Sequence, residues 1–463
     1  MKHILHTLLI FIAMVPFTLM AQWTPAIKMS THPIHASINE EMGQDMEVST
    51  DTVHVVWWDQ RTLGAALYYR RSIDTGATWN TDVPITDTTG SATRCAIAVS
   101  GRNIHVLWLD NRLGHSATYY KRSLDGGNTW GPDICLDSNT LFWGGISANG
   151  PLVVVSLNKG IVDSTNVYFM RSLDNGTSWS TETQISATPG SGRAEDPAIS
   201  TDGSYVHLSW NDDRNGNMEI YYRRSTDKGV TWGAETHLIN NGTHKSYTSM
   251  VSLFDSSVVI PCGDNRTGTY NIFIKQSSDS GTSWGPDVQV TNNTHTNSYP
   301  YMVQNKSILH LLFYRIDDST IMYMRSSDDG VTWGYIDTIG IGDQQPFLQY
   351  TGTVLHVIWS SRGIIYYMRN LTANSFTFTS VREINNSSNP AIFPNPATNN
   401  ATINFGEDGT HAIELYDIAG RKISGFTSMH KEFTFSCGEL SAGMYFVKVY
   451  YNDCNRIIKF LKQ

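Results

Sequence analysis

An eight-residue phrase returns six times along the chain and constrains its fold more than any other feature. The first copy runs from Ser72 to Trp79, with Asp third, Gly fifth, and Ser or Thr directly before the Trp. Successive tryptophans of the phrase lie about 50 residues apart, a period that is typical of stacked repeat units. The Asp residues of the six copies are Asp74, Asp125, Asp174, Asp227, Asp279 and Asp328.

The phrase has the residues of a tight, self-contained turn. An Asp carboxylate can accept hydrogen bonds from backbone N–H groups of its own turn, and Gly readily takes a positive φ. The Trp that ends the phrase can bury a large ring between neighbouring sheets. Because such a turn needs no ligand, we expect these six Asp residues to be structural.

This pattern, S-x-D-x-G-x-[ST]-W, closely resembles the Asp-box, or bacterial neuraminidase repeat, of sialidase-like β-propellers. In that family the Asp-box joins the third and fourth strands of a blade, on the face away from the ligand pocket. The resemblance therefore implies a β-propeller over residues 22–385, with the six Asp residues in its scaffold.

Counting strands favours seven blades over the six of the sialidase fold, which stays the alternative. Second strands of the repeat recur seven times, from 53–58 to 354–359, and the third strands match them in number. No segment has helical periodicity, so we expect an all-β fold. A ring of blades usually closes by pairing strands from its two ends, and both 26–30 and 381–385 have the pattern of a spare outer strand.

The N-terminus has the pattern of a secretory signal peptide over residues 1–21. Lys2 provides a basic start, an apolar run follows from Ile4 to Met20, and Ala21 offers a small residue at the cleavage point. No later stretch approaches the roughly 20 apolar residues that span a bilayer. We expect an exported protein with no transmembrane segment after signal cleavage.

The C-terminal region changes in composition. Residues 386–392 are rich in Asn and Ser and predict a linker, whereas residues 393–463 alternate like a small β-sandwich. Three phrases, beginning at Phe393, Ile413 and Leu440, resemble those of the type A sorting domain of type IX secretion. The resemblance implies that the secretion machinery is a partner and that the protein is secreted or displayed on the outer cell surface. A plain adhesion sandwich is the alternative.

Charge and cysteines exclude other classes of function. A net charge of −9 and a pI near 5.9 provide no basic face for nucleic acid. The five cysteines match no zinc or CxxC spacing, so we assign neither a metal nor a cofactor. Cys437 and Cys454 could form a bridge, and the other three are expected to be small buried residues.

A second repeated phrase, W-x-D-x-R, falls in the loops after the second strands. It ends at Arg61, Arg112 and Arg214, with a variant that ends at Arg266. In one interpretation each Arg pairs with its neighbouring Asp and locks one blade to the next, since Arg forms bidentate ion pairs well. In the other, these four arginines and Arg193 bind a ligand, as arginines of sialidases hold the sugar carboxylate.

Three functions remain open on these grounds. The preferred one is a non-catalytic module that binds a glycan or a surface protein. The alternative is an exo-acting glycoside hydrolase of sialidase type, for which Glu195 and Asp196 are the candidate proton-transfer residues. The third is a structural surface protein without a small ligand.

Overall fold

The structure is a computed structural model of the 463-residue chain. It describes residues 23–30, 44–61, 64–87, 90–140, 144–161, 164–187, 192–239, 246–247, 251–334, 336–343, 345–371, 391–393, 397–405, 409–417, 421–441, 443–451 and 454–462. The predicted signal peptide and the candidate closing strand 381–385 lie outside these residues. Within them, no helix has the length and apolar character needed to cross a membrane.

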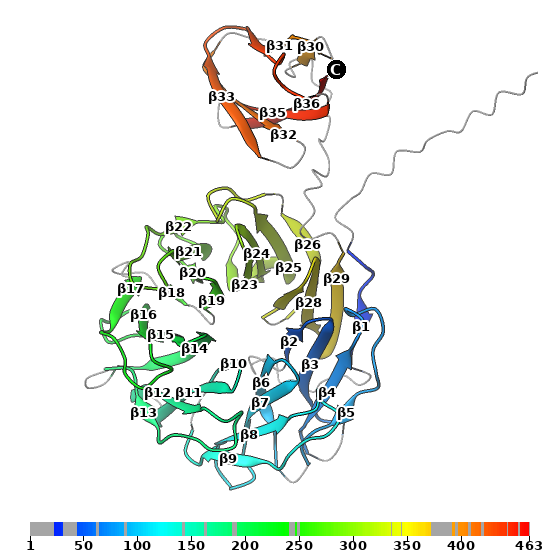
Figure 1. Ribbon diagram of the computed structural model, residues 1–463. Helices are drawn as coiled ribbons and strands as arrows, with labels where there is room; N and C mark the ends of the chain where they lie inside the picture. Colours follow the sequence, from blue (N-terminus) through cyan, green and yellow to red (C-terminus); the bar gives the residue numbers. More distant parts are fainter. Residues whose placement is uncertain are drawn as a thin grey trace, which may run out of the picture. The chain divides into compact units, whose positions relative to one another are not determined.

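The chain divides into two compact units, of which Trp23–Asn374 is the larger. This unit is a ring of seven sheets around a central channel, as Figure 1 shows. The seven-bladed propeller expected from the strand count is therefore confirmed.

Blades 1 to 6 each have four main strands that run outward from the channel in chain order. Blades 1 to 3 comprise β2 (Gln44–Ser49), β3 (Thr52–Asp59), β4 (Ala66–Ser72), β5 (Val83–Pro84); β6 (Thr93–Ser100), β7 (Asn103–Asp110), β8 (Ala117–Ser123), β9 (Ile134–Asp137); and β10 (Ile146–Asn149), β11 (Leu152–Ile161), β12 (Ser164–Ser172), β13 (Thr183–Gln184). Blades 4 to 6 comprise β14 (Ala194–Asp202), β15 (Tyr205–Asp212), β16 (Glu219–Ser225), β17 (Thr236–Ile239); β18 (Ser246–Tyr247) with β19 (Ser252–Phe254), β20 (Ser257–Asp264), β21 (Asn271–Ser277), β22 (Val288–Gln289); and β23 (Asn297–Asn305), β24 (Ile308–Arg315), β25 (Thr320–Ser326), β26 (Asp337–Ile341).

The seventh blade joins the two ends of the ring. It contains β27 (Phe347–Thr351), β28 (Val354–Ser361) and β29 (Ile364–Asn370), and its outer strand is β1 (Ile27–Lys28). Ile27 pairs with Tyr367, and the Met29 N–H donates to the Ile365 carbonyl at 2.8 Å. Of the two candidate closing strands, the N-terminal one pairs with the last blade.

The Asp-box tryptophans fill the spaces between blades. Trp79 of blade 1 packs edge-on against Tyr367 of blade 7, with ring centroids 4.8 Å apart. Gly76 of the same Asp-box lies so close to this tyrosine that a Cβ would sit 1.7 Å from its hydroxyl oxygen. The next four blades repeat the aromatic contact with the preceding blade through Trp130, Trp179, Trp232 and Trp284.

Polar contacts join the same neighbours. In blades 1 to 5 and 7, the last residue but one of the third strand donates a side-chain hydrogen bond to a backbone carbonyl in the Asp-box of the next blade. Arg224 of blade 4, for example, donates to the Ser280 carbonyl of blade 5 at 2.7 Å. Arg71, Arg122, Arg171, Gln276 and Arg369 make the equivalent bond. Each Asp-box therefore holds two blades together.

A buried His–Tyr pair recurs inside the blades. In blade 1 the Nδ1 of His54 on the second strand lies 2.7 Å from the hydroxyl of Tyr69 on the third. Equivalent pairs are made by His105, His207, His310 and His356. Burial lowers the pKa of His54 and His356 to about 3, and that of His105 and His207 to about 4. These imidazoles are therefore neutral core residues at physiological pH.

The second unit contains a three-stranded and a four-stranded sheet. Their strands are β30 (Ala391–Phe393), β31 (Asn400–Asn404) and β34 (Glu432–Ser436), and β32 (His411–Asp417), β33 (Lys422–Ser428), β35 (Gly443–Tyr451) and β36 (Cys454–Lys462). Strand β30 begins two residues before the predicted start of this domain, inside the expected linker. Cys437 is a buried free thiol, so the bridge to Cys454 is not formed, and Cys135 is exposed rather than buried.

Candidate functional site

The Asp-boxes have the geometry of self-contained turns. In the first copy, Asp74 Oδ1 accepts the Thr78 N–H at 2.8 Å and the Ser72 hydroxyl at 2.7 Å, and Oδ2 accepts the Thr78 hydroxyl at 2.6 Å. The bonds from Ser72 and Thr78 lower the pKa of Asp74 to about 2. The carboxylate oxygens are thus occupied by their own turn, which lies between the third and fourth strands.

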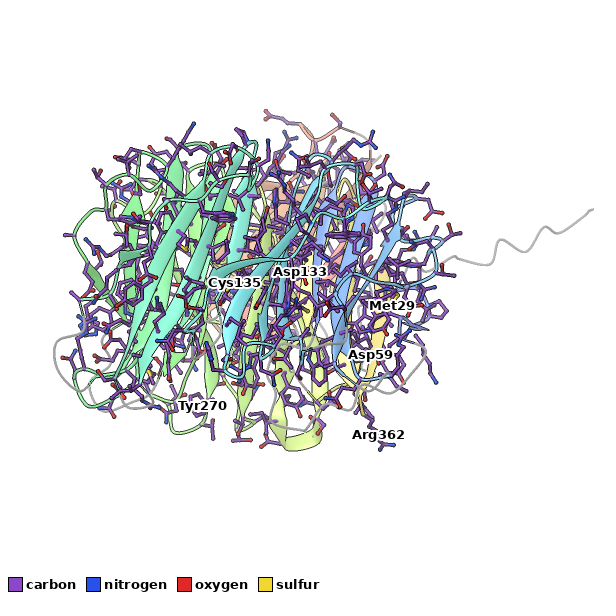
Figure 2. The ribbon with its side chains drawn as sticks, turned by 90° about the horizontal axis from the view of Figure 1, so that it is seen from below. Met29, Asp59, Asp133, Cys135, Tyr270 and Arg362 are labelled. Atoms are coloured by element: carbon purple, nitrogen blue, oxygen red, sulfur yellow. The ribbon has the colours of Figure 1, made fainter. Side chains whose placement is uncertain are left out.

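The loops after the second strands lie at the opposite end of the blades. Figure 2 views the propeller edge-on. Tyr270 and Arg362, which both belong to such loops, lie at different places along its lower edge, and Asp59 lies above Arg362. The W-x-D-x-R arginines are in these loops.

Arg61 is enclosed by carboxylates and an aromatic ring. Its Nη2 lies 2.6 Å from Asp59 Oδ2, and its Nη1 lies 2.5 Å from Asp82 Oδ2. Its guanidinium carbon lies 3.8 Å from the centroid of the Tyr68 ring. Asp59 is fully buried and Asp82 directly precedes the outer strand β5. The cluster therefore connects the loop to the outer strand of its own blade. The expectation that this ion pair would lock one blade to the next does not hold for Arg61.

The same cluster is built in three further blades. Arg112 lies 2.6 Å from Asp110 and 2.8 Å from Asp133, and its hydrogen bond with Asp110 raises the pKa of the guanidinium. Arg214 pairs with Asp212 and Glu235, and Arg266 pairs with Asp264 and Asp287. Every one of the four arginines thus has at least two carboxylate partners, and Arg112 has a third in Asp87 at 3.9 Å. This is the ion-pair geometry, and a ligand-binding role for these residues stays a prediction.

Blade 3 achieves a similar arrangement with a lysine that the W-x-D-x-R pattern misses. Lys159 Nζ lies 2.9 Å from Asp137 and 2.6 Å from Glu182, and 5.4 Å from the centroid of the Tyr168 ring. Asp137 belongs to blade 2, so this cation does bridge two blades. A search for a basic residue over a third-strand aromatic would have found it.

The candidate proton-transfer residues lie at the start of β14. Arg193 is 40 % exposed in its side chain, contacts Asp213 at 3.0 Å and lies 3.8 Å from Glu195. Asp196 has a positive φ of 50° at a bulge in the innermost strand and accepts from Asn211 at 3.2 Å. Arg94 and Tyr299 have the same backbone conformation at bulges in β6 and β23. The bulge is thus a repeated feature of the scaffold, and a catalytic role for Glu195 and Asp196 stays a prediction.

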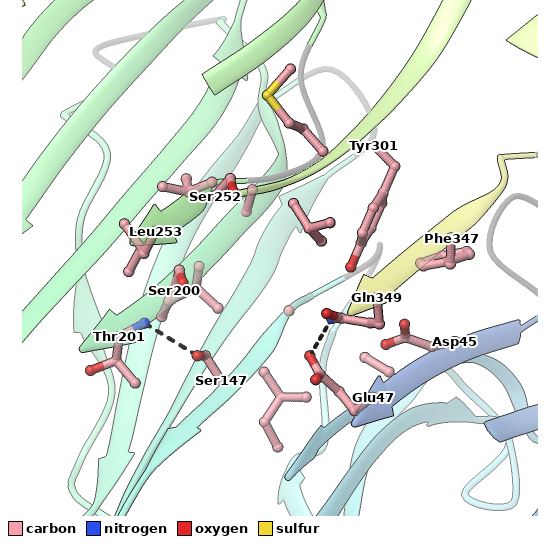
Figure 3. A pocket seen from close by; sticks show the side chains of 18 of the residues that line it. Asp45, Glu47, Ser147, Ser200, Thr201, Ser252, Leu253, Tyr301, Phe347 and Gln349 are labelled. Carbon is pink, nitrogen blue, oxygen red and sulfur yellow. Dashed lines mark hydrogen bonds between the residues drawn. The ribbon is translucent and has the colours of Figure 1, made fainter. Parts of the chain in front are cut away.

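The central channel contains a chamber of about 530 Å³. All seven innermost strands contribute to its wall, which Figure 3 shows from close by. Tyr301 and Phe347 form an aromatic pair in this wall, with ring centroids 5.1 Å apart. Hydroxyl groups come from Ser147, Ser200 and Ser252 on three successive blades, at positions equivalent to Glu47 in blade 1.

Two carboxyl groups of β2 face this chamber. Asp45 accepts the N–H groups of Met46 at 2.7 Å and Ile97 at 2.9 Å, and Glu47 accepts the Gln349 side-chain amide at 3.0 Å. Burial raises the pKa of Asp45 to about 7 and that of Glu47 to about 8. Sequence reasoning overlooked both residues, because the strand that carries them has no repeated motif.

Two further residues lie in or just before β23. Tyr299 is exposed, and His295 Nδ1 lies 3.2 Å from Asp317. Within the part of the chain that the structure describes, no three His, Cys, Asp or Glu side chains gather as metal ligands.

Comparison with known proteins supports the two-part organisation. The model of the BNR repeat-like domain matches residues 145–298, and the model of the secretion system C-terminal sorting domain matches residues 391–463. The chain carries BNR repeats and a secretion sorting domain. With this tail, the chain is exported by type IX secretion to the cell surface or the extracellular space.

Solved structures resemble the BNR propeller in fold. An ulvan lyase of polysaccharide lyase family PL25 aligns with a TM-score of 0.52 and 12 % identity, over 73 % of this chain and 93 % of that one. The polysaccharide lyase Uly1 aligns with a TM-score of 0.51 and 11 % identity, over 72 % and 91 %. A Trypanosoma rangeli sialidase with sialic acid has a TM-score of 0.43 and 12 % identity, over 93 % and 86 %. No curated protein matches the sequence, and identities this low establish the fold alone.

Proposed function

We propose that the BNR propeller is a non-catalytic module that binds a glycan outside the cell, with a surface protein as the alternative ligand. The observation that carries this proposal is the channel chamber, whose wall combines an aromatic pair with hydroxyl and amide groups. Such a combination suits a sugar, because rings pack on pyranose faces while a few polar groups bind the hydroxyls.

The state of the loop arginines argues against a sialidase mechanism at these residues. A sugar carboxylate would have to compete with the carboxylates that each guanidinium already contacts. For Arg214, the competing partners are the fully buried Asp212 and the half-buried Glu235. Removing the cation from a buried carboxylate is costly, so these arginines are poorly placed to receive an anionic substrate.

The purified protein on an array of surface and matrix glycans tests this proposal. We expect selective binding, and the variant Tyr301→Ala should weaken it at least tenfold because the ring forms part of the chamber wall. Tyr205→Ala is the matched control, since Tyr205 is an exposed aromatic residue outside the chamber. Equal binding by wild type and Tyr301→Ala would show that the glycan binds elsewhere.

The alternative function is an exo-acting glycoside hydrolase, for which the cluster of Arg193, Glu195 and Asp196 is the specific observation. Arg193 is the most exposed of the five candidate arginines in its side chain. A fluorogenic sialoside tests this function directly. Turnover that Glu195→Gln or Asp196→Asn abolishes would reject the non-catalytic proposal.

A further inference from the structure

The channel chamber is strongly acidic. Its described lining includes Asp45, Glu47, Asp202 and Asp255, and no Lys, Arg or His. Clefts lined by one sign of charge concentrate ligands of the opposite sign. An anionic sugar such as a sialoside or a uronate is therefore disfavoured in this chamber.

The two innermost acids differ from the buried carboxylates of the loop clusters. Asp59, Asp110, Asp212 and Asp264 are buried in the loop clusters, and each contacts an arginine. The hydrogen bonds to Asp45 and Glu47 come instead from backbone N–H groups and the neutral Gln349 amide. No described side chain supplies them with a cation, although charged carboxylates in such surroundings are normally paired.

An unused hydroxyl group lines the same space. Ser252 is only 5 % exposed and lines the chamber, where Figure 3 shows its side chain in the wall. Its hydroxyl has no hydrogen-bond partner among the described residues. The Ser252 hydroxyl is therefore available to hydrogen-bond a polar ligand in the chamber.

We propose that the chamber binds the protonated amine of an amino sugar, with Asp45 and Glu47 as its counter-charges and Tyr301 and Phe347 beside it. An ammonium group supplies charge and several N–H donors to carboxylates, and aromatic faces add a favourable cation–π contact. A volume of about 530 Å³ suits a sugar unit better than a bare metal ion. This inference rests on the proposed glycan-binding function and names its ligand class.

Binding of a cation should release protons. Burial raises the pKa of both Asp45 and Glu47, so part of the pair is protonated at neutral pH, and a bound ammonium would favour the charged forms. The titratable groups against the pair are Cys95 on β6 and Tyr301 on β23, and burial raises their pKa values well above the usual range. These two groups stay neutral, so the pH dependence belongs to the carboxyl pair.

Calorimetric titrations with matched probes test the inference. Glucosamine oligomers should bind at least tenfold more tightly than N-acetylglucosamine oligomers, which differ in lacking the charge. Tetramethylammonium, which does not titrate, should bind more tightly as the pH rises from 6 to 9. Asp45→Asn and Glu47→Gln should each reduce binding of the amine probes at least tenfold. Asp51→Asn, in an exposed turn of the same blade, should leave binding unchanged.

The outcomes separate this inference from the proposed function. Equal binding of acetylated and free-amine oligomers would overturn the ammonium site and leave glycan binding intact. Binding of tetramethylammonium that requires Asp45, without binding of any oligosaccharide, would support the site and reject the glycan function. If neither amine probe binds, the inference is wrong, and the glycan array alone decides the function.

Discussion

Single residues of the Asp-box carry contacts that reach into the neighbouring blade. Gly76 has a φ of +79° and faces the Tyr367 hydroxyl, whereas Gly114, with a φ of +84°, has no heavy atom within 4 Å of the point where a Cβ would lie. The two glycines share a backbone conformation and differ only in their surroundings. Substituting each glycine therefore distinguishes the free-energy cost of a positive φ from the cost of a steric clash with the neighbouring blade.

Alanine at these two positions should destabilise the propeller unequally. Gly114→Ala should cost about 1–2 kcal/mol, because an L-residue is strained in the left-handed region. Gly76→Ala should cost a further 1–3 kcal/mol or so, because its Cβ collides with Tyr367 across the blade boundary. Chemical denaturation of both variants measures the difference. Equal losses would mean that the blades are not in contact at this point.

Replacing an arginine of the W-x-D-x-R loops should lower the stability of the fold more than replacing an arginine whose partner is exposed. Arg214→Met leaves the fully buried Asp212 without its cation, which should cost about 3–5 kcal/mol. Arg315→Met is the control, since its partner Asp318 is 43 % exposed, and it should cost about 1 kcal/mol or less. Denaturation midpoints compare the two. A stable Arg214→Met protein that has lost its ligand would instead support a binding role for Arg214.

Among the strands and turns, the sequence predicts those whose contacts join residues close together in the chain. The turn residues from Ser72 to Trp79 lie within eight positions of one another, so the Asp-box and its place between strands could be read directly. The pairing of β1 with β29 could not, because it joins Ile27 to Tyr367, from the first and the last strand of the propeller, and a second segment had the same pattern. Lys159 was missed for a different reason. A lysine stands where other blades have an arginine, so the motif is lost although the contacts with carboxylates and an aromatic ring remain.

Removing the closing strand should expose β29 as a sheet edge. In a chain that lacks residues 23–30, the Ile365 and Arg369 N–H groups lose Ser30 and Thr24 as acceptors. Hydrogen exchange in β29 should accelerate and the melting temperature should fall, because edge strands open more easily. Strand β25 of blade 6 is the internal control. Unchanged exchange in β29 would mean that another segment replaces β1.

For the molecule as a whole, acid should lower the stability of the propeller by protonating its buried histidines. The folded-state pKa values of His54, His105, His207 and His356 lie below the ordinary value of 6.5. Their contribution to stability is complete above pH 6.5 and is lost as the pH falls toward 4, because the unfolded chain binds the protons. Each pair should lose on the order of 2 kcal/mol by pH 4.

Thermal melting between pH 8 and pH 4 measures this dependence. His207→Gln removes one titrating pair, so its melting temperature should fall less steeply with acid than that of the wild type. The channel acids act in the opposite sense, because their raised pKa values cost stability as the pH rises from their ordinary values of 3.8 and 4.5 toward about 7 and 8. An identical acid slope in both proteins would contradict the role assigned to the histidines.

The chamber was hidden from the sequence because only ring closure assembles it. Asp45 and Tyr301 belong to blades 1 and 6, and each lies on an innermost strand without a repeated phrase. The innermost strands differ from one another in sequence, whereas the loops that hold the blades together repeat. The sequence differences between the innermost strands were thus the feature that pointed to the chamber, and a search for repeated phrases passes over them.

The pairing of β1 with β29 also sets an order of events. The strand that is synthesised near the start must wait, without its partner, until the last blade has followed it. Until then the propeller is not closed, and the innermost strands of the first and the last blades do not yet form one channel wall. The proposed chamber is therefore complete only after the last blade has emerged, so a ligand of that chamber has no site while any blade is still missing.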